Sequence, residues 1–168
     1  MHTFGMHGLI MQVYIMRHGQ AFTSGTDDAL RELTSEGKLE ANEMAKWIAK
    51  QNIAIDKVIV SPFVRAQQTV KEISSSIGKD VAITTLDFIT PSGSAQRMHD
   101  YIDGICVSEN VGHLLIVSHM PLVCYLVAEL TSDGDCPIFQ TASIAHIDYD
   151  IERMKGELVS LTAPSDLD

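Results

Sequence analysis

The sequence is short of positive charge. It has 12 Lys and Arg against 22 Asp and Glu, which gives a formal net charge of -10 at pH 7. Because phosphate backbones and anionic membrane surfaces are held by Lys and Arg, we expect neither a nucleic acid nor a membrane as partner. If the ligand is a phosphate, the few cations must be gathered at one site, since the overall field repels an anion.

Cysteines and long apolar runs are also scarce. The three cysteines are widely spaced and include no CxxC pair, so we expect neither a disulfide framework nor a structural zinc site. This favours a reducing compartment, the cytoplasm, and we interpret Cys106 and Cys124 as small core residues. No apolar run approaches the roughly 20 residues of a membrane helix.

The N-terminus has little that is typical of a signal peptide. Residues 1–10 contain no Lys or Arg and no long apolar stretch, and a strand pattern begins at Met11. We therefore predict an N-terminal extension outside the fold at residues 1–10 and a single domain at residues 11–168.

Strand patterns alternate with helical patterns along most of the chain. We expect strands at residues 11–16, 56–60, 81–86, 113–117, 144–149 and 158–161, and helices at about 35–50, 63–76, 94–107 and 122–130. Thr34 or Ser35 is the expected N-cap of the first helix. This order predicts an α/β fold: a three-layer sandwich with a mostly parallel central sheet and helices on both faces.

Polar side chains follow three of the predicted strands. Arg17 and His18 come directly after the first strand, and Arg65 lies just beyond the second. His119 follows the fourth strand. Because ligands of open α/β sheets bind beyond the carboxyl ends of parallel strands, we expect these side chains to meet in one pocket.

Two arginines and two histidines in one pocket are suited to a phosphoryl group. The guanidinium groups of Arg17 and Arg65 offer forked donors to phosphate oxygens. A neutral histidine can attack phosphorus through one ring nitrogen. The sequence contains no Asp-rich metal motif and no GxxxxGK loop, so it predicts phosphate chemistry without a metal or cofactor.

Four short motifs resemble the histidine phosphatase superfamily. They are MRHG at residues 16–19, LTxxG at 33–37, VSPFVRAQQT at 60–69 and VSH at 117–119. They stand in the family's order, and the resemblance covers about residues 11–162. The short chain, without an inserted second lobe, is most similar to the small SixA-type phosphohistidine phosphatases.

The resemblance implies a role for each matched residue. His18 would carry the phosphoryl group, and Arg17, Arg65 and His119 would bind its oxygens. Arg31, just before the LTxxG motif, resembles a further basic residue at the mouth of the site.

The sequence departs from the family where many members hold an acid. Phe88 stands where a glutamate would fall, with Asp87 one residue earlier. Met120 stands where the acid phosphatase branch has an aspartate after its second histidine. No general acid is therefore obvious.

This absence bears on the substrate. An alkyl phosphate expels a poor alkoxide that an acid must protonate, whereas a phosphohistidine expels imidazole, whose conjugate acid has a pKa of about 6.5. We therefore hypothesise a metal-independent phosphatase that acts on His-phosphorylated signalling or carrier domains through a phosphorylated His18, and that phosphate analogues bind in the site.

Two alternatives stay open. A phosphatase for small phosphate esters would be favoured if Asp87, Glu109 or Asp133 folded over the site. An adaptor that binds phosphate or phosphoprotein with little turnover has no need of a nucleophilic histidine. We interpret Ser61 and Ser118 as turn and hydrogen-bonding residues rather than nucleophiles, because neither lies in a GxSxG context.

Overall fold

A single mixed sheet organises the chain. The computed structural model describes residues 9–24, 27–78 and 80–168. Within them lie β1 (Ile10–Arg17), α1 (Ser35–Lys50), β2 (Lys57–Val60), α2 (Val64–Ile77), β3 (Ala82–Thr85), α3 (Ala95–Ser108), β4 (His113–Ser118), α4 (Leu122–Leu130), β5 (Ile144–Asp150) and β6 (Lys155–Thr162), with short 3-10 helices η2 (Asp28–Leu30) and η3 (Pro164–Asp166). The strand order is β3-β2-β4-β1-β5-β6. The first four are mutually parallel, and β5 and β6 add an antiparallel edge.

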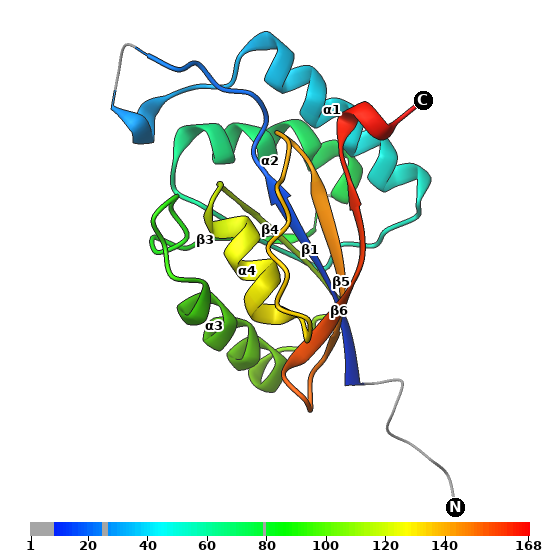
Figure 1. Cartoon of the computed structure of the whole chain (residues 1–168). Helices are drawn as coiled ribbons and strands as arrows, with labels where there is room; N and C mark the ends of the chain where they lie inside the picture. Colours follow the sequence, from blue (N-terminus) through cyan, green and yellow to red (C-terminus); the bar gives the residue numbers. More distant parts are fainter. Residues whose placement is uncertain (1–8, 25–26, 79) are drawn as a thin grey trace, which may run out of the picture.

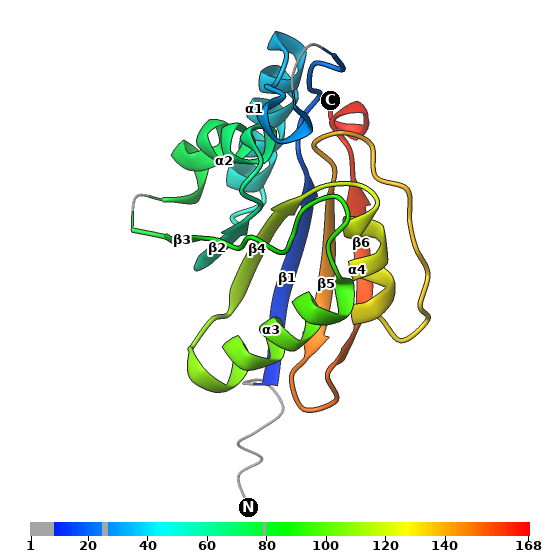
Figure 2. The ribbon, with the colours of Figure 1, turned by 90° about the vertical axis from the view of Figure 1, so that its left-hand side faces the viewer.

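Helices cover both faces of this sheet, so the predicted three-layer α/β fold is confirmed (Figures 1 and 2). Alternate residues of β1 divide between the two layers. Val13 and Ile15 pack with α3 and α4, whereas Tyr14 and Met16 pack with α1 and α2.

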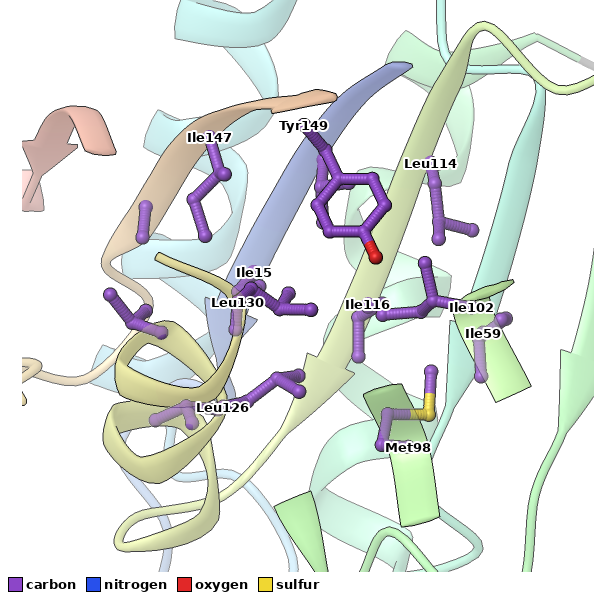
Figure 3. Packing of buried hydrophobic residues seen from close by; sticks show 14 of the residues in the cluster. Ile15, Ile59, Met98, Ile102, Leu114, Ile116, Leu126, Leu130, Ile147 and Tyr149 are labelled. Atoms are coloured by element: carbon purple, nitrogen blue, oxygen red, sulfur yellow. The ribbon is translucent and has the colours of Figure 1, made fainter. Parts of the chain in front are cut away.

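The layer between the sheet and helices α3 and α4 is closely filled by aliphatic side chains (Figure 3). Ile15 and Ile116 of the sheet lie in one buried cluster with Leu126 of α4 and Met98 of α3. Full burial of such a side chain stabilises the fold by about 2 kcal/mol. This packing fixes the strands whose ends carry the predicted site.

The segment that follows β1 crosses very close to the first turn of α1. Thr34 caps the helix as predicted, since its hydroxyl oxygen accepts from the Gly37 N–H at 3.0 Å. A Cβ built on Gly37 would lie 2.0 Å from the carbonyl oxygen of Gln20, and one built on Gly19 would lie 2.5 Å from the carbonyl oxygen of Gly37. Both positions therefore need glycine for the segment after His18 to pass the helix.

The prediction that the chain has no disulfide is wrong. Cys124, in the first turn of α4, is bonded to Cys136, with their Cα atoms 4.7 Å apart. After α4 ends, the segment 131–143 runs back along the helix, so residues 12 apart in sequence become neighbours (Figure 2). Cys106 is a free thiol, and burial, helped by Asp103, raises its pKa to about 11. The cysteines therefore no longer argue for a reducing compartment.

The N-terminal boundary lies close to the predicted one. Ile10 already pairs with Asp150 in the sheet, and the Leu9 carbonyl accepts from the Ile151 N–H at 2.8 Å. Residues 1–8 are outside the described part of the chain, so the predicted extension and the single domain stay predictions. None of the described helices combines the length and the apolar character needed to cross a bilayer.

Replacement of Gly37 by alanine tests the crossing. The new methyl group would overlap the backbone oxygen of Gln20, so we expect the free energy of unfolding to fall by about 3 kcal/mol in urea denaturation. Gly104 is a matched helical control, because a Cβ there has no heavy atom within 4 Å. Gly104→Ala should leave stability unchanged or raise it by up to about 1 kcal/mol. Equal effects of the two substitutions would contradict the crossing.

Candidate active site

The carboxyl ends of β1, β2 and β4 meet at one edge of the sheet. In the strand register, Arg17 lies beside Ser118, and Val60 lies beside Val117. Segments that are far apart in the sequence therefore arrive at one place, as the sequence predicted. The residues that directly follow these strand ends are His18, Ser61 and His119.

His18 is held with one ring nitrogen protonated and the other carrying a lone pair. Its Nδ1 lies 2.6 Å from the carbonyl oxygen of Gly19, which can only accept, so Nδ1 carries the proton. Its Nε2 then has the lone pair, and the Nε–H of Arg65 points to it at 3.2 Å. Burial lowers the pKa of His18 to about 4. The charges of Arg65 and Arg17 lower it as well, whereas the hydrogen bond to Gly19 opposes the shift. The ring is therefore neutral at pH 7.

Arg65 reaches the site from the first turn of α2 and is 2% exposed. Its Nη1 donates to the carbonyl oxygen of Asp28 at 2.6 Å, and its Nη2 lies 3.2 Å from the Asp28 carboxylate. Thr69 fixes the backbone behind it, because its hydroxyl donates to the Arg65 carbonyl at 2.7 Å and accepts from the Gly19 N–H at 3.1 Å. Thr69 thus joins the helix to the turn that carries His18.

Arg17 is held from the other side of the site by the segment before β5. Its Nη1 donates to the Phe139 carbonyl at 2.8 Å, and its backbone N–H donates to the Ser143 carbonyl at 3.0 Å. The Nε of Arg17 is buried and has no partner among the described residues. The guanidinium therefore keeps one donor without a partner in the described part of the chain.

His119 is almost fully buried, and its ring centroid lies 5.0 Å from that of His18. Its Nε2 is 2.7 Å from the hydroxyl oxygen of Ser61, while its Nδ1 has no partner in the part of the chain that the structure describes. Burial, together with the neighbouring His18 and Arg65, lowers the pKa of His119 to about 2. Both imidazoles of the site are therefore uncharged at neutral pH.

Arg31 lies at the edge of this group, and Asp28 links it to Arg65. Arg31 Nε donates to the Asp28 carboxylate at 2.9 Å, and its Nη1 donates to the Phe22 carbonyl at 2.6 Å. The Arg31 hydrogen bond, with Arg65, holds the pKa of Asp28 below its usual value, so Asp28 is ionised and unsuited to donate a proton. Sequence reasoning missed Asp28, although its position three residues before Arg31 was a usable signal.

None of the three carboxylates considered as general acids forms a hydrogen bond or ion pair with His18, Arg17, Arg65 or His119 in the described part of the chain. Asp87 is exposed after β3 and makes no hydrogen bond or ion pair with the described residues. Glu109 pairs at 2.8 Å with Lys57, at the amino end of β2, which is the far end from the site. The Asp133 carboxylate accepts a hydrogen bond from the Thr131 hydroxyl, and Thr131 forms a β-bridge with Gly156 near the start of β6.

Apolar residues stand at the two positions where the resemblance implied an acid. The guanidinium carbon of Arg97 lies 4.0 Å from the centroid of the Phe88 ring, and Met120 packs against the core. Around His18 the structure thus gathers arginine donors and a second neutral imidazole, an arrangement that can hold a dianionic phosphoryl group beside a nitrogen lone pair. Among the described residues no group of three or more His, Cys, Asp or Glu could hold a metal ion.

The low pKa of His18 predicts how stability depends on pH. The pKa of His18 is about 4 in the folded protein and about 6.5 in the unfolded chain, so below pH 6.5 the unfolded chain takes up the proton first. The stability that the neutral His18 contributes is therefore fully present above pH 6.5 and is lost as the pH falls toward 4. Between these values the free energy of unfolding of the wild type should fall more steeply than that of His18→Asn, by up to about 1.4 kcal/mol per pH unit. Chemical denaturation across this range measures both slopes, and parallel curves would contradict a buried neutral His18.

Comparison with known proteins gives one family. The histidine phosphatase superfamily (branch 1) matches residues 13–87. Phosphohistidine phosphatase SixA of Escherichia coli is 39% identical over 140 residues, which cover 83% of this chain and 86% of the relative. A SixA homolog of Haemophilus influenzae is 34% identical over 148 residues, 83% of this chain and 89% of the relative. The structure of the protein histidine phosphatase SixA complexed with tungstate matches with a TM-score of 0.89 and 37% identity, over 94% of this chain and all of that one. The chain therefore belongs to the histidine phosphatase superfamily.

Proposed function

We propose that this protein is a metal-independent phosphohistidine phosphatase that acts on a His-phosphorylated protein domain. The observation that carries the proposal is the Nε2 lone pair of His18, which is buried beside Arg65 and forms no hydrogen bond with a carboxylate among the described residues. The names of the SixA relatives, a phosphohistidine phosphatase and a protein histidine phosphatase, support the same substrate class.

The reaction would proceed in two displacements at phosphorus. In the first, His18 Nε2 attacks a phosphohistidine whose other ring nitrogen carries a proton, the P–N bond to the substrate breaks, and neutral imidazole leaves, while phospho-His18 keeps its Nδ1–H. In the second, water attacks the phosphorus of phospho-His18, and the P–N bond to Nε2 breaks to release inorganic phosphate and a proton. Arg17, Arg65 and His119 would bind the phosphoryl oxygens in both steps, because positioning and charge stabilisation provide most of the catalysis of phosphoryl transfer.

The absence of a nearby acid favours an N-linked phosphate over an ester. Imidazole leaves with little help, since its conjugate acid has a pKa of about 6.5, whereas an alkoxide needs a proton from a positioned acid. The first step also exchanges one P–N bond for another, so its two sides should be nearly equal in free energy. Asp28, the carboxylate that contacts Arg65, is ionised and cannot supply that proton, which suits this chemistry.

Asp28 and Arg31 would act before the chemical step. The Asp28 carboxylate engages Arg65 and Arg31, so it partly balances the charge of the arginines. An incoming phosphoryl group would take over donors of Arg65 from this carboxylate. We propose a His-phosphorylated signalling or carrier domain as the partner, and the cytoplasm stays the proposed location, now without support from the cysteines.

Release of phosphate from two substrates tests the function. Wild-type protein should release phosphate rapidly from a His-phosphorylated phosphotransfer domain and at least about 100-fold more slowly, per kcat/KM, from a simple alkyl phosphate such as glycerol 2-phosphate. His18→Ala should lose both activities because the nucleophile is gone. His113→Ala removes a histidine from the opposite end of β4 and should keep both.

Two other results would support the alternatives. Preference for the ester would indicate a small-molecule phosphomonoesterase on this fold. Stoichiometric binding of the phosphoprotein, with no His18-dependent release from either substrate, would indicate an adaptor.

A further inference from the structure

The hydroxyl of Ser61 lies directly behind the ring of His119. Ser61 is fully buried at the end of β2, and its Oγ is 2.7 Å from His119 Nε2. The contact joins residues 58 positions apart, so it exists only because β2 and β4 are neighbours. The nitrogen on the other side of the ring, Nδ1, is the one without a partner among the described residues.

Every other polar group of Ser61 is already engaged. Its N–H donates to the Val117 carbonyl at 3.1 Å, and its carbonyl accepts from Gln67 Nε2 at 2.8 Å. Its Oγ accepts from the Phe63 N–H at 3.2 Å. The proton on Oγ is therefore the one group left, and among the described residues His119 Nε2 is the acceptor in reach of it.

The two neutral tautomers of His119 differ in how many buried groups they leave without a partner. If Nε2 carried the proton, it would donate to Ser61, and the Ser61 hydroxyl would lack an acceptor among the described residues. If Nδ1 carries the proton, the Ser61 hydroxyl donates to Nε2 and is satisfied, and since Nδ1 has no partner among the described residues in either form, the two forms differ by the Ser61 hydroxyl alone. Because a buried unpaired polar group costs about 1–3 kcal/mol, the contacts favour the Nδ1–H form. The doubly protonated ring is excluded at neutral pH, since burial lowers the pKa of His119 to about 2.

We propose that Ser61 is a positioning residue, which fixes His119 as the Nδ1–H tautomer so that a neutral donor, rather than a lone pair, faces the phosphoryl group. This inference rests on the proposed function of the same site. The ring of His119 lies beside that of His18, at 5.0 Å between centroids, so a phosphoryl group on His18 would be within its reach. A lone pair at Nδ1 would repel phosphoryl oxygens, whereas an N–H would bind them.

The tautomer can be measured without any assay of activity. In protein labelled with ¹⁵N at histidine, long-range ¹H–¹⁵N correlation spectra at pH 7 distinguish a protonated from an unprotonated ring nitrogen, and the loss of signals in His119→Asn assigns the residue. We expect protonated Nδ1 in the wild type and a mixture of forms in Ser61→Ala. Protonated Nε2 or an imidazolium in the wild type would overturn the proposal, and this result does not depend on how Ser61→Ala folds.

Kinetics with the His-phosphorylated domain provide a second test through a double-mutant cycle. The side-chain amide of asparagine can place an N–H near the position of Nδ1, and it has no tautomer for Ser61 to set. Ser61→Ala should therefore lower kcat by about tenfold in the wild type and by less than about twofold in the His119→Asn background, with KM little changed in both. Equal losses of kcat in the two backgrounds would overturn the proposal.

Ser118→Ala is the matched control for loss of a buried hydroxyl. Ser118 is as buried as Ser61, but its hydroxyl donates at 2.7 Å to the Ile89 carbonyl instead of to His119. Its effect on kcat should be the same in both backgrounds. If the protein hydrolysed no phosphohistidine at all, the proposed function would fail, and the ring tautomer of His119 would still decide the role of Ser61.

Discussion

An imidazole that is buried among guanidinium groups controls the chemistry of this protein. Taking His18 out of water and surrounding it with cations makes its protonated form unfavourable, so the ring keeps a lone pair at neutral pH. The Gly19 carbonyl decides which nitrogen holds that lone pair, and Arg65 holds it in place. The sheet register, the glycine crossing at α1 and the Thr69 bridge all serve to place these groups within hydrogen-bonding distance.

The charge distribution follows from the same requirement. A chain with net charge -10 must collect its cations if it is to bind an anion, and Arg17, Arg31 and Arg65 come together from three separate segments. Asp28 lies between Arg31 and Arg65 and offsets part of their mutual repulsion. The site thus has excess positive charge, as phosphate binding requires, and Asp28 limits the repulsion that this charge adds to the fold.

Much of the fold could be predicted from the sequence because its signals are local. Apolar runs that end in polar clusters mark β1, β2 and β4, and Thr34 marks the start of α1, so their bounds agree with the prediction within one or two residues. The meeting of His18, Arg65 and His119 followed from one rule, that parallel strands end at the same edge of a sheet.

The features that could not be predicted depend on where irregular segments pass. The Phe139 carbonyl holds Arg17, and Cys136 meets Cys124, because the segment 131–143 runs back along α4. No periodicity in that segment indicates its path. Asp28 begins the short 3-10 helix η2 and contacts Arg65 across 37 residues, a pairing that needs the folded positions of η2 and α2.

The most direct test is to trap the phosphorylated protein during turnover. A His-phosphorylated domain labelled with ³²P would be mixed with the protein and quenched in alkali within the first turnovers, and the labelled peptide would be identified. We expect a label that is stable in base and labile in acid, on the peptide that contains His18, rising and decaying before free phosphate reaches its plateau. Phosphate release at full rate with no label on His18, or with the label on another residue, would contradict the proposed mechanism.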